Sequence, residues 1–141
     1  MFVRLSANEF FTGLLAGLAH TGTRRISIRG DSFDLAVEAV ARELVEKHGD
    51  EVELGFRVKP HYIHGDSAVV RDAIASAAQA DLISLDNPEY QDIRLKIGPE
   101  TADLILDELP VDRRIFLELA DLFLLAYDRA RPEEAATRLI A

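Results

Sequence analysis

The sequence has no cysteine among its 141 residues. Disulfide bonds, thiol catalysis, iron–sulfur clusters and cysteine-ligated zinc are therefore all excluded. Positive charge is also scarce, because 16 basic residues stand against 25 acidic residues and leave a net charge of −9. Nucleic acids and anionic membranes attract proteins with excess positive charge, so we expect neither as a partner.

Several kinds of segment are missing as well. No stretch has the proline, serine or glycine content of an interdomain linker, so we expect residues 1–141 to form a single domain. The apolar stretch from Leu122 to Tyr127 is far too short to span a bilayer, and no signal-peptide pattern is present. Glycine-rich nucleotide-binding motifs are absent too. We therefore expect a cytoplasmic protein without a cofactor.

Hydrophobic periodicity predicts an α+β fold. Ser6 and Glu9 match a capping box at the start of the first helix. Apolar residues alternate with polar ones in the predicted strands, and recur at helical spacing elsewhere. We predict a two-layer domain with a mixed sheet of about four strands, a βαβ unit over 24–59 and a helical C-terminal third. The predicted helices span 6–22, 32–47, 67–80, 99–109, 111–130 and 132–140, and the predicted strands 24–29, 51–59, 82–85 and 92–97.

The first predicted helix has Gly13 and Gly17 one turn apart, so one of its sides is bare backbone. Such a side suits close approach to a ligand or close packing against a neighbouring element. Packing is the commoner reason for two glycines at this spacing, and we favour it here.

Strand alternation predicts one apolar and one polar face for the sheet. Basic residues gather on the polar face, together with Glu51 and Glu53, and we predict that this face meets an acidic protein partner. Tyr90, at the tip of the loop 86–91, is a candidate contact, because tyrosine is enriched at interfaces. The basic residues of this predicted partner face are Arg25, Arg29, Arg57, Lys59, Arg94 and Lys96.

The helix predicted at 111–130 is apolar around most of its circumference. A helix of this kind has to be covered on nearly all sides, which is difficult within one small chain. A homodimer interface would cover the second side, whereas burial as a central core helix is the alternative. The residues assigned to the dimer interface are Phe116, Leu119, Phe123 and Tyr127.

The connection before the helix at 67–80 contains His61, His64 and Asp66. Imidazole and carboxylate are natural ligands for zinc, manganese or iron, so these three residues are the candidate metal site of a small metal-dependent enzyme. The other two histidines, His20 and His48, end predicted helices and are interpreted as surface residues.

The helix at 67–80 and the hairpin after it resemble the second half of a winged helix, which would imply a DNA-binding regulator. The helix offers Arg71 as its basic residue, and the wing carries Asp86, Glu89 and Asp92. The three carboxylates of the wing repel phosphate, so we consider the DNA-binding regulator a weaker hypothesis than the metal-dependent enzyme.

The leading hypothesis is a non-catalytic protein-interaction or regulatory module that acts as a homodimer. No catalytic residues are assigned, because no nucleophile stands with a recognisable general base. The metal-dependent enzyme and the winged-helix-like regulator are kept as alternatives.

Overall fold

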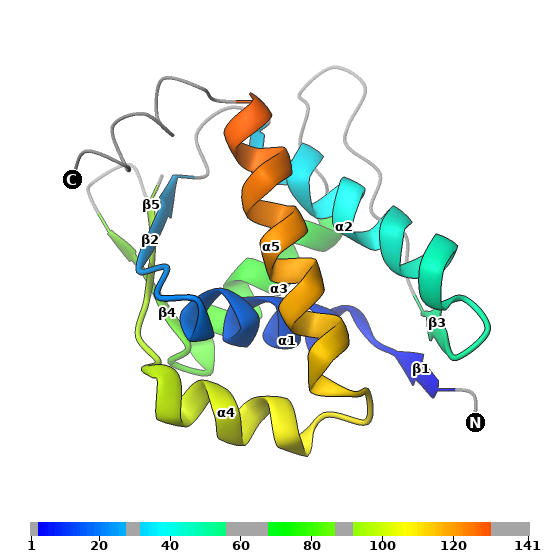
Figure 1. Cartoon of the computed structure of the whole chain (residues 1–141). Helices are drawn as coiled ribbons and strands as arrows, with labels where there is room; N and C mark the ends of the chain where they lie inside the picture. Colours follow the sequence, from blue (N-terminus) through cyan, green and yellow to red (C-terminus); the bar gives the residue numbers. More distant parts are fainter. Residues whose placement is uncertain (1–2, 28–31, 56–67, 87–91, 131–141) are drawn as a thin grey trace.

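The structure is a computed structural model that describes residues 3–27, 32–55, 68–86 and 92–130 (Figure 1). The helices in these ranges are α1 (Ala7–His20), α2 (Ser32–His48), α3 (Ala68–Gln79), α4 (Pro99–Glu108) and α5 (Arg113–Ala130). The strands are β1 (Val3–Leu5), β2 (Arg25–Ser27), β3 (Val52–Leu54), β4 (Ile83–Asp86) and β5 (Asp92–Leu95). The α+β class and the helical C-terminal part are confirmed. The helix predicted at 132–140 lies outside the described residues.

The described strands form two small sheets at opposite ends of the helices (Figure 1). β1 pairs in parallel with β3, with Val3 opposite Val52. β5 lies between β2 and β4 in an antiparallel sheet, with Ile26 opposite Ile93. Both isoleucines are buried, as the alternating pattern predicts.

This strand arrangement differs from the predicted mixed sheet of about four strands. The predicted βαβ unit is wrong, because β2 pairs with β5 and β3 pairs with β1. Alternation identifies a strand and its buried face, but it carries no information about the partner strand. β1 is only three residues long and was not predicted, although it supplies the partner of β3.

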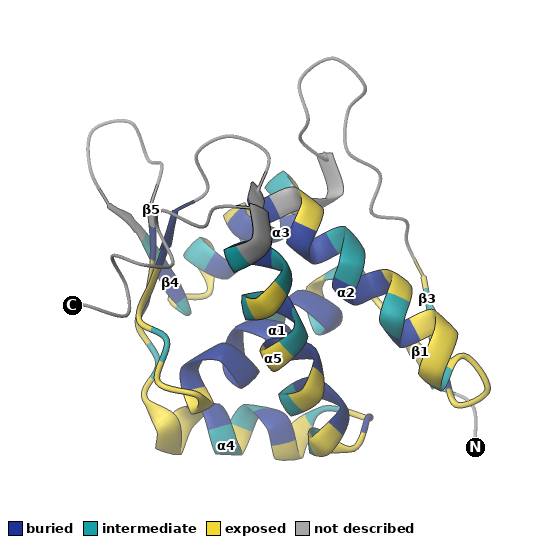
Figure 2. Cartoon of the chain, turned by 45° about the horizontal axis from the view of Figure 1, so that its top comes forward, coloured by how far each residue is buried: buried dark blue, intermediate teal, exposed yellow. Residues whose placement is uncertain are grey.

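α1 begins at the predicted capping box. The Glu9 backbone N–H donates to Ser6 Oγ at 3.1 Å, and the Ser6 N–H donates to Glu9 Oε1 at 2.9 Å. The helix then runs through the middle of the molecule, and Figure 2 shows it buried along most of its length. The buried residues are Phe10, Phe11, Gly13, Leu14, Leu15, Ala16, Gly17, Leu18 and Ala19.

α5 lies against the glycine side of α1. A Cβ atom added to Gly13 would overlap the Phe116 ring, and one added to Gly17 would meet the Phe116 carbonyl oxygen at 2.8 Å. The two glycines therefore let α5 approach the α1 backbone, which confirms the packing interpretation.

Aromatic rings join α1, α2 and α5. The Phe33 ring meets Phe11 and Phe123 edge-on, with centroid distances of 6.0 and 5.4 Å. Tyr127 stacks on Phe123 at 5.9 Å, and its hydroxyl donates to the Ser27 carbonyl at 2.9 Å. This hydrogen bond ties the C-terminal part of α5 to the end of β2.

The residues assigned to a dimer interface are instead part of this core. Their exposed fractions are 0% for Phe116, 2% for Leu119, 0% for Phe123 and 1% for Tyr127. Side chains buried within one chain leave no surface for a second copy, so the assignment of these four residues is corrected. The side of α5 that they form packs on α1 and α2. No helix in the described ranges has both the length and the apolar character needed to cross a membrane.

Candidate functional site

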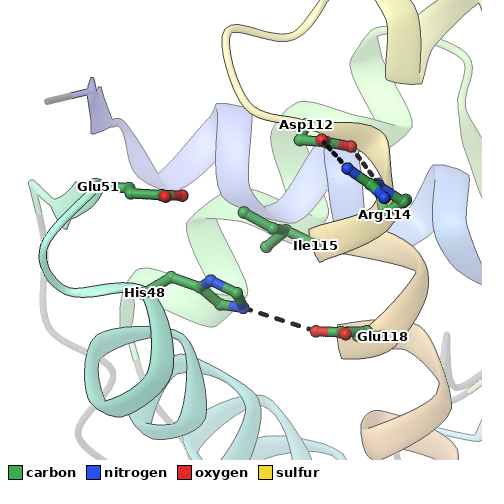
Figure 3. Close-up of a pocket in the computed structure, with 6 residues that line it drawn as sticks. All are labelled: His48, Glu51, Asp112, Arg114, Ile115 and Glu118. Atoms are coloured by element: carbon green, nitrogen blue, oxygen red, sulfur yellow. Dashed lines mark hydrogen bonds and ion pairs between the residues drawn. The ribbon is translucent and has the colours of Figure 1, made fainter. Parts of the chain in front are cut away.

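A charged hollow of about 330 Å³ lies between the end of α2 and the start of α5 (Figure 3). The turn after α2 brings Glu51 to its edge, where the Glu51 N–H donates to the His48 carbonyl at 2.9 Å. The residues that line the hollow are His48, Glu51, Asp112, Arg114, Ile115 and Glu118.

Asp112 forms the α5 side of the hollow by capping that helix. Its Oδ1 accepts from the Arg114 N–H at 2.9 Å, and its carbonyl accepts from the Ile115 N–H at 3.0 Å. A carboxylate at a helix N-terminus satisfies free N–H groups and interacts favourably with the helix dipole. Arg114 and Glu118 follow one turn apart, so both side chains lie on the hollow side of α5.

Two charge pairs line the hollow, one within the start of α5 and one between α2 and α5. Arg114 Nη2 donates to Asp112 Oδ2 at 3.1 Å, and His48 Nε2 lies 3.5 Å from Glu118 Oε2 (Figure 3). The His48 side chain is 23% exposed, so this predicted surface residue is partly covered where it lines the hollow. Among the described residues Glu51 has no cationic partner, and it stands at the opposite edge from Asp112 and Arg114 (Figure 3).

The hydrogen bonds fix the charges of one pair. Bonds from the Arg114 side chain, and then from its backbone N–H, hold the pKa of Asp112 below its ordinary value. The same pairing raises the pKa of Arg114. Both groups therefore remain charged around neutral pH. With Glu51 and Glu118 the hollow has three carboxylates against one guanidinium, and Ile115, only 7% exposed, adds an apolar side chain.

The residues of the predicted metal site, His61, His64 and Asp66, lie outside the described residues. Within the described ranges, no three histidine or acidic side chains are placed to hold a metal ion.

The predicted partner face is placed only in part. Arg25 and Arg94 lie directly opposite each other on β2 and β5, which puts their side chains on the same side of the sheet. Arg94 Nε donates to Ser84 Oγ at 3.2 Å, and Lys96 forms an ion pair with Asp81. The remaining residues of this face, Arg29, Arg57, Lys59 and Tyr90, lie outside the described residues.

The two acidic residues assigned to the same face belong elsewhere. Glu53 is on β3, and Glu51 directly precedes that strand, whereas Arg25 and Arg94 belong to the other sheet. The prediction of one surface shared by these groups is therefore wrong. The error arises because the prediction assumes that all strands belong to a single sheet.

Sequence reasoning missed the hollow, because its residues come from two segments that are more than 60 positions apart. One local signal was available: Asp112 directly precedes α5, which is the position of a capping carboxylate. Comparison with family models, with curated proteins and with solved structures finds no match to this chain. Function therefore has to be inferred from the residues of the chain itself.

Proposed function

We propose that this chain is a non-catalytic protein-interaction module of the cytoplasm, and that the hollow between α2 and α5 receives a cationic side chain of a partner protein. The observation that carries the proposal is the composition of the hollow. Three carboxylates stand on its rim, and Ile115 supplies an apolar contact beside them. Arginine and lysine have the matching shape, because an apolar stem bears a charged end.

The charge states support binding over acid–base catalysis. A general acid or base works best when its pKa lies near the working pH. In the hollow, the pKa of Asp112 is lowered and that of Arg114 is raised, so both shifts lead away from neutrality. Asp112 and Arg114 thus balance each other, and the carboxylates of Glu51 and Glu118 are the groups that would hold a cation.

Glu51 and Glu118 line the hollow from different sides (Figure 3), which favours an organic cation that can bond in more than one direction. A guanidinium has several N–H donors in one plane and can bond carboxylates from two directions. The hollow, at about 330 Å³, has room for one long side chain. We therefore expect arginine to bind better than lysine.

The test is an NMR titration of the ¹⁵N-labelled chain with acetyl-argininamide, and with the neutral isostere acetyl-citrullinamide as control. Saturable shifts are expected at the amides of Glu51, Ile115 and Glu118 with the arginine compound alone. The variant Glu118→Gln should weaken binding about two- to fivefold, since an exposed ion pair contributes about 0.2–1 kcal/mol. The matched variant Glu46→Gln changes an exposed carboxylate outside the hollow and should bind normally. Equal shifts with both compounds would contradict the proposal.

The homodimer stays part of the proposal, with its interface moved away from the core side of α5. On the outer side of this helix Leu125 is 50% exposed, and Leu122 is partly buried. Native mass spectrometry should give a dimer for the unchanged chain and a monomer for Leu125→Glu. A monomer for both would remove the dimer from the proposal.

The same spectra test the metal-dependent alternative. A bound ion would appear as added mass on chain purified without chelator, and its loss in His61→Ala would favour the enzyme over the interaction module. The acidic partner of the basic face, and the winged-helix-like regulator, likewise stay predictions.

A further inference from the structure

The most exposed of the large apolar side chains described belongs to α4. This helix lies along one edge of the molecule (Figure 1) and packs on α1 through Ala102 and Leu106, which are 0% and 1% exposed. Leu104 lies on the opposite side, where 65% of its surface is exposed. A single exposed leucine is ordinary protein surface, so the neighbours of Leu104 decide whether the position means more.

Those neighbours are acidic. Glu100 and Glu108 stand four residues before and after Leu104, and both are exposed. In a helix this spacing places the three side chains in one stripe, over about 12 Å of helix length. We call Glu100, Leu104 and Glu108 the outer stripe of α4.

Arg113, the basic residue that follows α4, pairs with two other carboxylates of this helix. Arg113 forms ion pairs with Asp103 and with Asp107 Oδ1, the latter at 3.3 Å. Among the described residues, neither Glu100 nor Glu108 has a cationic partner. Within the described part of the chain, two carboxylates without an ion pair therefore lie on either side of an exposed apolar side chain.

Charge is concentrated in this part of the chain as a whole. Residues 99–121 include seven acidic and two basic residues, so they account for −5 of the total net charge of −9. A surface with this charge repels phosphate groups of nucleic acids and lipids, and attracts a basic protein segment. An apolar anchor ringed by charged residues is also the usual anatomy of a protein interface.

We propose that the outer stripe of α4 docks a basic amphipathic helix of the partner, one with an apolar residue flanked by lysine or arginine at the fourth position on each side. This inference rests on the proposed function, because it assumes a basic protein partner and adds a second contact surface. The apolar residue of the partner packs on Leu104, while its two cations meet Glu100 and Glu108. The matching period of four residues favours a helix over an extended segment.

The probe is a synthetic alanine-based helical peptide that has leucine flanked by lysine at both fourth positions. Its binding to the full chain is measured by fluorescence anisotropy, with a peptide that has alanine in place of this leucine as the control. The leucine peptide should bind about tenfold tighter, since burying a leucine side chain removes substantial apolar area from water.

Three variants of the chain separate the contributions. Leu104→Ala should abolish the preference for the leucine peptide, while the double variant Glu100→Gln/Glu108→Gln should weaken both peptides about tenfold and reduce the salt dependence. Leu35→Ala removes another exposed leucine, one of α2 that is 44% exposed, and should bind both peptides normally. All these side chains are exposed, so circular dichroism should show unchanged folding.

The outcomes distinguish this inference from the proposed function. If Leu104→Ala keeps the preference for the leucine peptide, the outer stripe is not the docking surface and the inference fails. If the α4 variants bind the peptides as the unchanged chain does, while acetyl-argininamide still binds the hollow, the inference fails and the proposed function stands. If the chain binds neither peptide nor acetyl-argininamide, both are overturned.

Discussion

Helix α1 is covered on nearly all sides, whereas α5, which lies against it, is covered along one side. Nine of the 14 residues of α1 are buried, and they face every direction around the helix. In α5 the fully covered residues keep to one side, and Leu125 on the opposite side is half exposed. The buried residues of α5 are Ile115, Phe116, Leu119, Ala120, Phe123 and Tyr127.

The difference follows from side-chain size. Gly13, Ala16, Gly17 and Ala19 make α1 thin, so neighbouring elements approach its backbone closely from several directions. α5 projects large side chains all round, and the described elements cover only one side of them. The central helix is therefore the thin one, although α5 is longer.

The largest expected effect contrasts the two sides of α5. Phe123→Ala should destabilise the fold by about 3–5 kcal/mol, because the ring is fully buried between Phe33 and Tyr127. Leu125→Ala should change stability by about 0.5 kcal/mol or less, as is usual for an exposed site. Urea unfolding followed by circular dichroism measures both. The value for Leu125→Ala refers to contacts within one chain, and any further loss that depends on protein concentration measures the proposed dimer, in which a second copy covers the outer side.

The glycine side of α1 gives the next effect. In Gly17→Ala the new Cβ lies 2.8 Å from the Phe116 carbonyl oxygen and 3.0 Å from Ala120 Cβ. Both atoms are fixed to the α5 backbone, so they can move away only if that backbone shifts. Overpacking costs about 1–3 kcal/mol, and the gain in helix propensity of about 1 kcal/mol offsets part of it.

The control for this variant is Asn8→Ala, an exposed position on the same helix. The two variants are compared by the urea concentration at half-unfolding. If Gly17→Ala were as stable as the control, α5 would not approach the α1 backbone as closely as the structure places it.

Tyr127→Phe tests the C-terminal part of α5 with a smaller change. It removes the hydroxyl that donates to the Ser27 carbonyl but keeps a ring stacked on Phe123. We expect a loss of about 0.5–1.5 kcal/mol, the usual net contribution of a hydrogen bond. Thermal unfolding of Tyr127→Phe and Tyr127→Ala separates the contribution of the hydroxyl from that of the ring, since alanine removes both. Unchanged stability of Tyr127→Phe beside a clear loss in Tyr127→Ala would contradict a contribution of the hydroxyl.

Local features could be predicted from the sequence because their causes are local. The capping box of Ser6 and Glu9 is confirmed, as is the burial of Ile26 and Ile93 on the inner face of their strands. The predicted helix 32–47 differs from α2 by one residue at its end. In each case the residues that determine the feature stand within a few positions of one another.

Features that depend on distant parts of the chain could not be predicted in this way. The partner of each strand, the central position of α1 and the hollow between His48 and Asp112 all depend on tertiary packing. Apolar content overstated the burial needed by α5, because half-exposed leucines are tolerated at the edge of a core. The same reasoning assigned Phe123 and Tyr127 to a dimer interface, whereas α1 and α2 already cover them.

The smallest expected effect concerns a charge contact that joins α1, α4 and α5. Asp103 pairs with Arg113, and His20 Nδ1 lies 3.1 Å from Asp103 Oδ1. Chiefly through the Arg113 hydrogen bond, the pKa of Asp103 lies below its ordinary value. A carboxyl whose pKa is lowered by folding stabilises the fold above its unfolded pKa, about 3.9, and loses this contribution as the pH falls through the folded pKa.

Asp103→Asn should therefore unfold at a slightly lower urea concentration than the unchanged chain at pH 7, and the gap should close as the pH is lowered below about 4. Because the pair is exposed, added salt should also narrow the gap at pH 7. The variant Arg113→Gln should have a similar effect, and the double variant should lose less than the two single variants together, since both remove the same contact. Strict additivity, or a gap independent of pH, would mean that α1 and α5 are joined by their apolar contacts alone.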